Sequence, residues 1–370
     1  MIRHRYCLFF VVSVIVAGCE VDPFENGRYG TRPGGAPEAT PNPTPPDPWF
    51  HIEIQQSAHD AADVLIAVDD SCSMGEEQAA LAASIQDLGR YLFDNTSLDA
   101  RVSVYRADLS QGIDGQAVGT PLYIDATVND PTVELATRIT SLGSGGSGTC
   151  ESGLAAIYLA INDALNNGYN AGVVRTDTPL TVLIMTDEPE QGVDGNCGYP
   201  QAEPSTWAAW LTDLHVNSPA QPVFCTIAGF SVADNITPSS CSSAYGSASA
   251  APRLGAVASL LGGITQSICS QNWSPFLQEC GFRASGLQTE FVVPVVPSLD
   301  YDDFDGDGDL TERALYVEID RLDGLGFVDL PTDDLSNPWV FNSVSNRIVF
   351  EWQIAPLDGW VLRISALPGS

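Results

Sequence analysis

The sequence predicts an α/β domain built on a mostly parallel sheet, followed by a smaller antiparallel β domain. In the middle of the chain, continuous apolar runs alternate with segments of helical spacing. Strands that alternate with helices indicate a parallel sheet covered by helices on both faces. After about residue 288 the pattern changes to short strands of period two separated by turns, which indicates an antiparallel sheet or sandwich.

The α/β region is expected between residues 60 and 285. The run at 64–68 is apolar without interruption, which is typical of a strand buried on both faces, and 180–185 is expected to be another buried strand. Pro131 begins one of the helices, where the missing N–H of proline costs nothing. Strands are expected at 64–68, 101–105, 122–124, 180–185 and 223–230, the third being a short edge strand. Helices are expected at 76–93, 131–142, 154–165, 207–214, 254–261 and 275–284.

The C-terminal region, residues 288–370, is expected to form a β-sandwich-like domain packed against the first domain. Its strands are expected at 291–293, 315–319, 340–341, 348–350 and 361–364. Its large aromatic side chains are interpreted as its core rather than as an aromatic binding face. These side chains are Trp339, Phe350, Trp352 and Trp360.

The charge of the chain excludes several kinds of chemistry. The 370 residues carry 15 Lys+Arg against 47 Asp+Glu, a net charge of −32, and all the cations are Arg. The absence of Lys excludes Schiff-base chemistry, a phosphate-loop Lys and a Ser-Lys nucleophile. The acidic balance argues against nucleic acid and anionic membrane surfaces as partners, because both require a basic face. Cations are the ligands that this composition favours.

The N-terminus resembles a bacterial lipoprotein signal. Arg3 and Arg5 precede a short apolar run at 8–16, which is too short to span a bilayer. Small residues then lead directly to Cys19, which would be acylated and become the first residue of an exported, lipid-anchored protein. Glu20 follows in place of the Asp that retains such proteins at the inner membrane, which favours the outer membrane. An ordinary secretory signal with an incidental Cys is the alternative.

A Pro- and Gly-rich tether is expected over 19–50, after the signal peptide at 1–18. Residues 33–48 contain seven Pro, and such a stretch stays extended rather than packing. The globular part then starts near Trp49, with the α/β domain expected over 51–287.

Oxygen-bearing side chains follow two of the buried strands. Asp69, Ser71 and Ser73 come directly after the first strand, and Asp187 follows the strand at 180–185. A Gly-rich loop between them ends at Thr149, just before a helix. In parallel sheets, ligands bind at the carboxyl ends of the strands. Hard oxygen ligands suit Mg²⁺, Mn²⁺ or Ca²⁺ rather than Zn²⁺ or Cu²⁺.

This set of residues resembles the metal-ion-dependent adhesion site of von Willebrand factor A (VWA) domains, a Rossmann-like family. The resemblance covers roughly residues 60–285. It implies that Asp69 and Asp187 hold the ion largely through water. It also implies that Ser71, Ser73 and Thr149 coordinate the ion directly or through water. One coordination position stays open for an acidic group on a protein or peptide partner.

The chain departs from the family pattern at two places. Glu188 stands where the family usually has Gly, and Glu190 adds a further carboxylate that would strengthen metal binding or repel an acidic partner. The spacing from Thr149 to the following Gly-Leu differs by one residue from the usual spacing, so Ser147 is the alternative ligand. A VWA fold whose site no longer binds metal is the alternative for the whole site.

The cysteines of an exported chain are expected to form disulfides. Because the site requires the loops of Cys72 and Cys150 to meet, it implies a Cys72–Cys150 bridge; two free thiols are the alternative. Cys241 and Cys269 flank a predicted helix and are expected to pair. An odd number remains without an assigned partner, so at least one thiol is unpaired or pairs between chains. These cysteines are Cys197, Cys225 and Cys280.

An acidic loop in the C-terminal region resembles a calcium loop. Its Asp-x-Asp-x-Asp-Gly spacing places side chains at alternating positions, and Gly308 permits the sharp turn. Ala314 stands where an EF-hand has its bidentate Glu, so a weaker Ca²⁺ turn over 303–311 is expected. A solvated acidic hairpin tip is the alternative. The candidate ligands are Asp303, Asp305, Asp307 and Asp309.

These features together predict a non-enzymatic protein of the bacterial envelope. We expect a membrane-anchored binding module of adhesion type, with a divalent ion that captures an acidic group on a protein partner. A structural envelope lipoprotein with purely stabilising metals is the first alternative. A metal-dependent hydrolase is the less favoured alternative, because no Lys is present and none of the four His has a clear place at the site.

Overall fold

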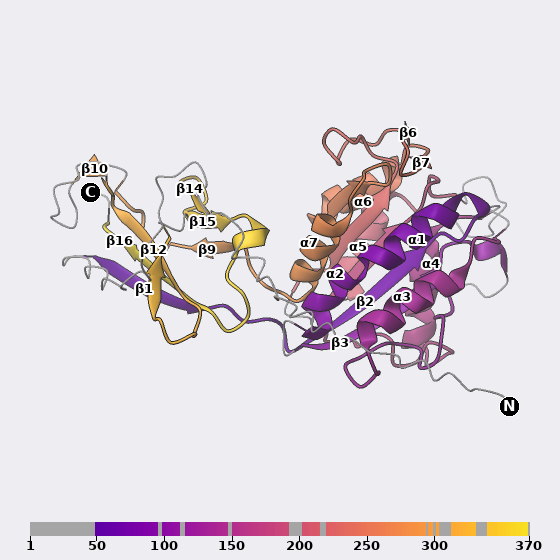
Figure 1. The fold of residues 1–370 in the computed structure, drawn as a ribbon, viewed down its shortest axis with the longest axis horizontal. Coiled ribbons are helices and arrows are strands. Elements are labelled where there is room, and N and C mark those ends of the chain that lie inside the picture. The colour runs from indigo at the N-terminus through magenta and orange to yellow at the C-terminus, as the bar shows by residue number, and fades with distance from the viewer. Residues whose placement is uncertain are drawn as a thin grey trace, which may run out of the picture.

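The computed structural model describes residues 49–94, 98–111, 115–146, 150–191, 202–214, 220–293, 295–298, 301–302, 312–330 and 339–368. Within these residues the chain forms an α/β body and a smaller β body, which lie side by side along the longest axis of the molecule (Figure 1). No helix in this described part of the chain combines the length and apolar character needed to cross a bilayer.

The α/β body is built on a five-stranded, fully parallel sheet, as the alternating pattern predicts. The strands, in spatial order, are β3 (Asp99–Arg106), β2 (Ala61–Val68), β4 (Leu180–Met185), β5 (Val223–Ala228) and β8 (Ile264–Ser267). Side chains of β2 alternate between two apolar clusters, with Val64 and Ile66 in one and Leu65 and Ala67 in the other. This explains the uninterrupted apolar run of β2, because both of its faces are buried.

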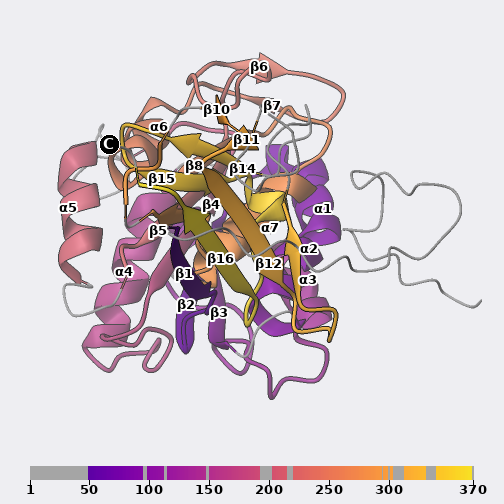
Figure 2. The same ribbon diagram turned by 90° about the vertical axis from the view of Figure 1, so that its left-hand side faces the viewer.

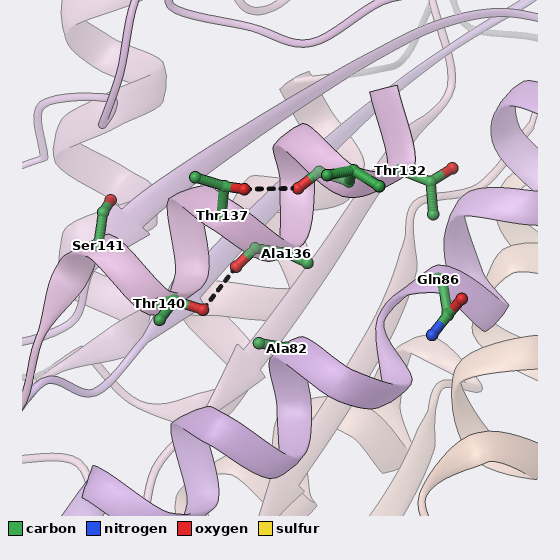
Figure 3. Close-up of a pocket in the computed structure, with 8 residues that line it drawn as sticks. Ala82, Gln86, Thr132, Ala136, Thr137, Thr140 and Ser141 are labelled. Atoms are coloured by element: carbon green, nitrogen blue, oxygen red, sulfur yellow. Dashed lines mark hydrogen bonds between the residues drawn. The ribbon is translucent and has the colours of Figure 1, made fainter. Parts of the chain in front are cut away.

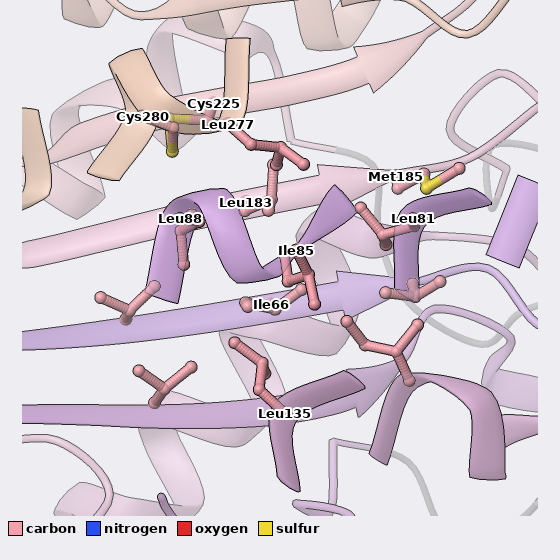
Figure 4. Close-up of a cluster of buried hydrophobic side chains, with 14 of the residues drawn as sticks. Ile66, Leu81, Ile85, Leu88, Leu135, Leu183, Met185, Cys225, Leu277 and Cys280 are labelled. Atoms are coloured by element: carbon pink, nitrogen blue, oxygen red, sulfur yellow. A yellow bond between two sulfur atoms is a disulfide. The ribbon is translucent and has the colours of Figure 1, made fainter. Parts of the chain in front are cut away.

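Helices cover both faces of this sheet. One face carries α1 (Gly75–Ser84), α2 (Gln86–Gly89), α3 (Pro131–Leu142) and α7 (Ser274–Ala284). The other face carries α4 (Gly153–Leu165), α5 (Pro204–Leu214) and α6 (Pro252–Leu261). Figure 4 shows the first cluster, in which Leu81, Ile85 and Leu88 pack over Ile66 of β2 and Leu183 of β4. This packing holds β2 and β4 in place, and the candidate site lies at the carboxyl ends of these two strands.

The structure differs from the prediction at three elements of the α/β body. The helix expected at 76–93 is divided into α1, α2 and a π-helical turn, Arg90–Asp94. The edge strand expected at 122–124 is reduced to one antiparallel bridge between Ile124 and Val102. Strand β8 was not predicted, because three of its four residues are polar and its place is set by pairing with β5.

The β body consists of two antiparallel sheets, which agrees with the predicted sandwich-like region. One sheet has the order β1 (Phe50–Gln55), β16 (Val361–Ala366), β12 (Leu315–Asp320) and β13 (Phe327–Asp329). The other has the order β14 (Trp339–Asn342), β15 (Arg347–Phe350) and β9 (Glu290–Val292). Trp339 and Phe350 are buried in its core, and Trp352 and Trp360 pack against that core, as expected.

Strand β1 changes the expected domain boundary. The predicted α/β domain began at residue 51, but β1 pairs antiparallel with β16, with Ile52 opposite Ile364. The β body is therefore assembled from both sides of the α/β body, which is inserted between β1 and β9. Figure 2, viewed from the β body, shows β12 and β16 in front of the parallel sheet.

Two short chain segments connect the bodies, 56–60 between β1 and β2 and 285–289 between α7 and β9, and hydrogen bonds join these segments to each other. The Gln56 side chain donates to the carbonyl oxygen of Gln288 at 2.8 Å, and the His59 amide donates to that of Ser285 at 2.8 Å. Phe282 of α7 is buried in the core of the β body, where Tyr91 packs against it edge-to-face. The α/β body thus contacts the β body through the amino end of its sheet and the end of α7.

Two short antiparallel pairings lie outside the three main sheets. Strands β6 (Cys241–Ser242) and β7 (Ser247–Ala248) form a small antiparallel ladder above the sheet. Strands β10 (Tyr301–Asp302) and β11 (Glu312–Arg313) form another. The predicted calcium loop lies between β10 and β11 and outside the described residues, as do the signal peptide, Cys19 and the tether up to residue 48. The tether was expected to reach residue 50, but Phe50 already begins β1.

Candidate metal centre

The candidate site lies at the carboxyl edge of β2 and β4. The two strands are parallel neighbours, with Val68 opposite Met185, so the loops that follow them meet. The Asp69 amide donates to the carbonyl oxygen of Met185 at 2.9 Å, which joins the two loops directly. The Gly-rich loop arrives from a third direction, where Gly146 donates its amide to the carbonyl oxygen of Asp70 at 2.9 Å.

Hydrogen bonds fix the orientation of Asp69. Its Oδ1 accepts from the Ser71 amide and its Oδ2 accepts from the Thr186 hydroxyl, both at 2.8 Å. The Gln78 side chain donates to the Asp69 carbonyl oxygen at 2.7 Å and ties the loop to α1. The Ser71 and Ser73 hydroxyl oxygens lie 3.0 Å apart. Three of the predicted oxygen ligands therefore share one short loop.

Three buried carboxylates meet at this edge. Asp69, Glu151 and Asp187 each offer an oxygen within 4.8 Å of the other two. Asp187 is only 5% exposed, and its Oδ1 has no hydrogen-bond partner although it is buried. An unpartnered carboxylate oxygen is costly to bury unless a cation compensates it. The oxygen-only donor set and this orphaned atom both fit Mg²⁺, Mn²⁺ or Ca²⁺.

The pKa values of the carboxyl groups at the site also favour a bound cation. Burial raises the pKa of Asp69 to about 6, against the hydrogen bonds from Ser71 and Thr186 that lower it. Burial, followed by repulsion from Asp69 and Asp187, raises the pKa of Glu151 to about 8. Burial and repulsion from Asp187 also raise the pKa of Glu188. A divalent cation among these groups would relieve both the repulsion and the desolvation.

Glu151 is the member of the cluster that the sequence reasoning missed. It follows Cys150 on the loop that leads into α4, two residues after the predicted ligand Thr149. Thr149 and its alternative Ser147 lie outside the described residues. The available signal was the position of Glu151 on the same loop as Thr149, next to the start of a helix. The VWA resemblance implies a hydroxyl ligand on this loop, so the carboxylate of Glu151 was not predicted as a ligand.

Two other acidic side chains near the site have different partners. Asp70 forms a salt bridge with Arg106, which also donates to the carbonyl oxygen of Leu142 at 2.6 Å. Glu190 accepts from the Ser152 hydroxyl at 2.6 Å and from the Leu154 amide at 3.0 Å, at the start of α4. Neither belongs to the cluster of three carboxylates, although Asp70 Oδ1 is also buried without a hydrogen-bond partner. Burial raises the pKa of Glu190 to about 7.

No protein-family model and no curated protein matches the sequence. Among solved structures, the chain is similar to a von Willebrand factor type A protein from Catenulispora acidiphila, with 12% identity, 89% of this chain and 67% of that chain covered, and a TM-score of 0.36. It is similar to proximal thread matrix protein 1 from the mussel byssus, with 11% identity, 64% and 49% covered, and a TM-score of 0.36. It is also similar to the pilus adhesin RrgA from Streptococcus pneumoniae, with 8% identity, 86% and 58% covered, and a TM-score of 0.32.

The chain thus spans about half the length of the mussel protein. Its own architecture is a sheet of five parallel strands in the order β3-β2-β4-β5-β8 between two layers of helices. The Asp69 and Asp187 loops leave the shared carboxyl edge of neighbouring strands. This Rossmann-like arrangement agrees with the fold that the sequence resemblance implies.

The predicted disulfide across the candidate site is wrong. Cys72 is an exposed free thiol, whereas Cys150 is buried and disulfide-bonded to another cysteine. The Cys72 thiol donates to the carbonyl oxygen of Gly146 at 3.7 Å, so the two loops meet without a covalent bond between Cys72 and Cys150. The alternative of a free thiol therefore holds for Cys72 alone. Elsewhere in the α/β body, Cys241 pairs with Cys269 as predicted, and Cys225 pairs with Cys280.

A groove between α1, α2 and α3 is a poorer candidate for chemistry than the carboxylate cluster at the sheet edge. It encloses about 480 Å³ and is lined by small apolar, hydroxyl and amide side chains, with no titratable group (Figure 3). Thr137 and Thr140 donate their hydroxyls to carbonyl oxygens of their own helix, at 2.8 and 2.9 Å. These hydroxyls are satisfied within α3, so the groove offers little that would orient a ligand.

Proposed function

We propose that this protein is an envelope protein-binding module of adhesion type, in which the α/β body holds a divalent metal ion for an acidic group on a protein partner. Asp69, Ser71, Ser73, Asp187 and the undescribed Thr149 would hold the ion. The ion would supply a positive centre at an otherwise strongly acidic surface. The observation that carries the proposal is the buried Asp187 carboxylate: its Oδ1 has no hydrogen-bond partner, and one of its oxygens lies within 4.8 Å of oxygens of Asp69 and Glu151.

The test is calorimetric titration of the protein with Mg²⁺, Mn²⁺ and Ca²⁺, compared with Asp187→Asn. The substitution preserves the size of the side chain and removes one negative charge, so it should weaken one binding event at least tenfold. Asp213→Asn is the matched control, because Asp213 is exposed on α5, away from the carboxyl edge of β2 and β4. A titration identical for the wild type and Asp187→Asn would contradict the proposed site.

Partner capture is tested with the same variants. Envelope proteins are retained on the immobilised wild-type protein in Mn²⁺ and eluted with EDTA. We expect the set eluted by EDTA to be missing from the Asp187→Asn column and present on the Asp213→Asn column. If metal binds the wild type and no retained protein depends on it, the ion is stabilising and the adhesion function is wrong.

We also propose that acylation of Cys19 anchors the protein in the membrane, most simply in the outer membrane, and that the Pro- and Gly-rich tether before β1 holds the folded bodies away from it. The support is the signal-like sequence before Cys19 and the seven Pro at 33–48. Replacing Cys19 with Ala should move the protein from the membrane fraction to the soluble fraction. A membrane association that survives this change would contradict the anchor.

A second ion is proposed for the acidic loop at 303–311, where Asp303, Asp305, Asp307 and Asp309 would bind Ca²⁺ weakly. The β10–β11 ladder brings the backbone of the two ends of this loop together. A binding event that is lost in a triple Asp303/Asp305/Asp307→Ala variant, and kept in Asp187→Asn, would assign the second ion to this loop. A triple variant with the wild-type Ca²⁺ titration would contradict it.

A further inference from the structure

We propose that Glu151 is an additional, internal ligand of the metal centre, and that it limits the access of an acidic partner group to the ion. The inference rests on the proposed function of the site and adds a regulatory residue that the adhesion-site pattern does not contain. It is carried by four properties of Glu151: the position of its oxygen, its burial, its fixed backbone and the charge that it brings.

The position of Glu151 suits direct coordination. Its carboxylate oxygen lies within 4.8 Å of an oxygen of Asp69 and an oxygen of Asp187. Two ligand oxygens on opposite sides of one ion are separated by twice the metal–oxygen distance, which is about 4.2 Å for Mg²⁺ and about 4.6–5.2 Å for Ca²⁺. All three oxygens can therefore contact one ion with small movements. Glu151 is 4% exposed, so its side chain is directed into the site rather than into solvent.

The backbone of Glu151 is held from two sides. It forms an antiparallel bridge with Asp108 on one side. On the other side, the Gln191 amide donates to the Glu151 carbonyl oxygen at 2.8 Å, and the Gln191 side chain donates weakly to Glu151 Oε2 at 3.3 Å. These contacts place the carboxylate at the site before any metal arrives. A pre-organised ligand loses less conformational entropy on binding than a mobile one.

The third carboxylate changes the charge of the loaded site. Asp69 and Asp187 together neutralise a divalent ion, and Glu151 then leaves a net charge of about −1. Glu77 and Glu188 lie close enough to Asp187 to add to this negative field. The nearby Arg106 is already paired with Asp70. An acidic partner group is therefore repelled at a site where the VWA resemblance implies attraction, unless the Glu151 carboxylate moves away from the ion.

Two consequences distinguish an internal ligand from a carboxylate that is only nearby. Neutralising Glu151 should weaken metal binding, because one direct ligand is lost. It should also strengthen the binding of a carboxylate probe to the metal-loaded site, because electrostatic repulsion falls. Glu188 is the matched control, since it is also acidic, interacts with Asp187 and lies outside the cluster of three. If these carboxylates acted only through their negative charge, neutralising Glu151 and neutralising Glu188 would change the metal and probe affinities equally.

The experiment measures Mn²⁺ binding by calorimetry for the full-length wild type, Glu151→Gln, Glu188→Gln and Asp187→Asn, with acetate then titrated into each Mn²⁺-loaded protein. The site event is the one that Asp187→Asn removes. We expect Glu151→Gln to weaken it by about 10- to 100-fold and to bind acetate at least threefold more tightly, whereas Glu188→Gln changes either value less than threefold. Circular dichroism confirms that each variant is folded, and Glu151→Ala serves as a second variant if Glu151→Gln is not.

The outcomes separate the two proposals. No Mn²⁺ event sensitive to Asp187→Asn would overturn the proposed function itself. An event that Asp187→Asn removes but Glu151→Gln leaves within threefold would preserve the metal site and overturn the role of Glu151. Equal changes in Glu151→Gln and Glu188→Gln would also overturn it, because the effect would then be that of general charge. A Mn²⁺-soaked crystal with a Glu151 oxygen about 2.2 Å from the anomalous peak would support it, and an intervening water would overturn it.

Discussion

Glu190 is a buried carboxyl whose titration should set part of the pH dependence of stability. Its pKa is raised by burial from the ordinary 4.5 to about 7. Between these values the folded state binds the proton more strongly than the unfolded state, so the free energy of unfolding falls as pH rises through this window. Below about pH 4 both states are protonated, and the penalty disappears.

Glu190→Gln should therefore stabilise the protein above pH 7. The amide oxygen can still accept from the Leu154 amide, and its NH₂ can donate to the Ser152 hydroxyl, so the contacts at the start of α4 survive. We expect urea unfolding at pH 8 to show a gain of about 1–3 kcal/mol, since one pKa unit corresponds to about 1.4 kcal/mol. The gain should vanish near pH 4, and Asp213→Asn should show no comparable gain. Equal stability of Glu190→Gln and wild type at pH 8 would refute the assignment.

Single residues show what the sequence can and cannot predict about the site. Asp69 and Asp187 were predictable, because a buried strand immediately before each one fixes where its loop begins. Glu151 was not predictable in the same way. Its orientation depends on Asp108 and on Gln191, 40 residues further along the chain, and neither contact leaves a mark in the local pattern. The outward direction of Cys72 is likewise a property of the folded loop.

Helix α7 is joined covalently to the parallel sheet by the disulfide between Cys225 of β5 and Cys280. Both cysteines are fully buried, and they lie 55 residues apart in the sequence. By the loop-closure estimate, a cross-link over this separation stabilises the folded state by about 4 kcal/mol. This helix also carries Phe282 into the β body, so its attachment matters to both bodies.

The double variant Cys225→Ala/Cys280→Ala should lower the free energy of unfolding by about 4 kcal/mol, measured by urea denaturation under oxidising conditions. Cys72→Ala is the control, because Cys72 is an exposed free thiol and should change stability by less than about 0.5 kcal/mol. A double variant as stable as the control would mean that packing alone holds α7 on the sheet.

Among the elements, the long apolar strands were predictable and the short or divided ones were not. The uninterrupted apolar run at 64–68 of β2 is typical of a strand with both faces covered. Strand β8 is specified mainly by the neighbour that it pairs with. The division between α1 and α2 occurs within a segment of continuous helical spacing, around Ile85, which remains buried against the sheet. Tertiary packing therefore decides these details.

At the scale of the whole molecule, the α/β body is an insertion in the β body. Strand β1 pairs along its full length with β16, from Phe50 opposite Ala366 to Gln55 opposite Val361. A partner about 310 residues away cannot be recognised from local periodicity, which is why β1 was expected to belong to the α/β domain. The β body consequently needs both ends of the described chain, whereas the parallel sheet is formed entirely within the insertion.

This arrangement predicts that damage to β1 acts mainly on the β body. Ile52 and Ile54 pack against its core, and their partners in β16 are Ile364 and Leu362. Replacing both with Asn should destabilise that body by roughly 2–4 kcal/mol, through lost apolar burial and two poorly satisfied amides. Gln55→Thr is the control, because Gln55 is exposed and its contact to the Gly359 carbonyl oxygen is long, at 3.4 Å.

Differential scanning calorimetry and limited proteolysis measure the result. We expect a transition that moves to lower temperature and early cleavage within 290–368, while the Mn²⁺ event that depends on Asp187 keeps its affinity. The metal centre lies at the carboxyl edge of the sheet, whereas the connections to the β body leave the other end of β2 and the end of α7. If the double variant instead weakens Mn²⁺ binding more than threefold, the Phe282 contact transmits strain through α7, and the two bodies behave as one cooperative unit.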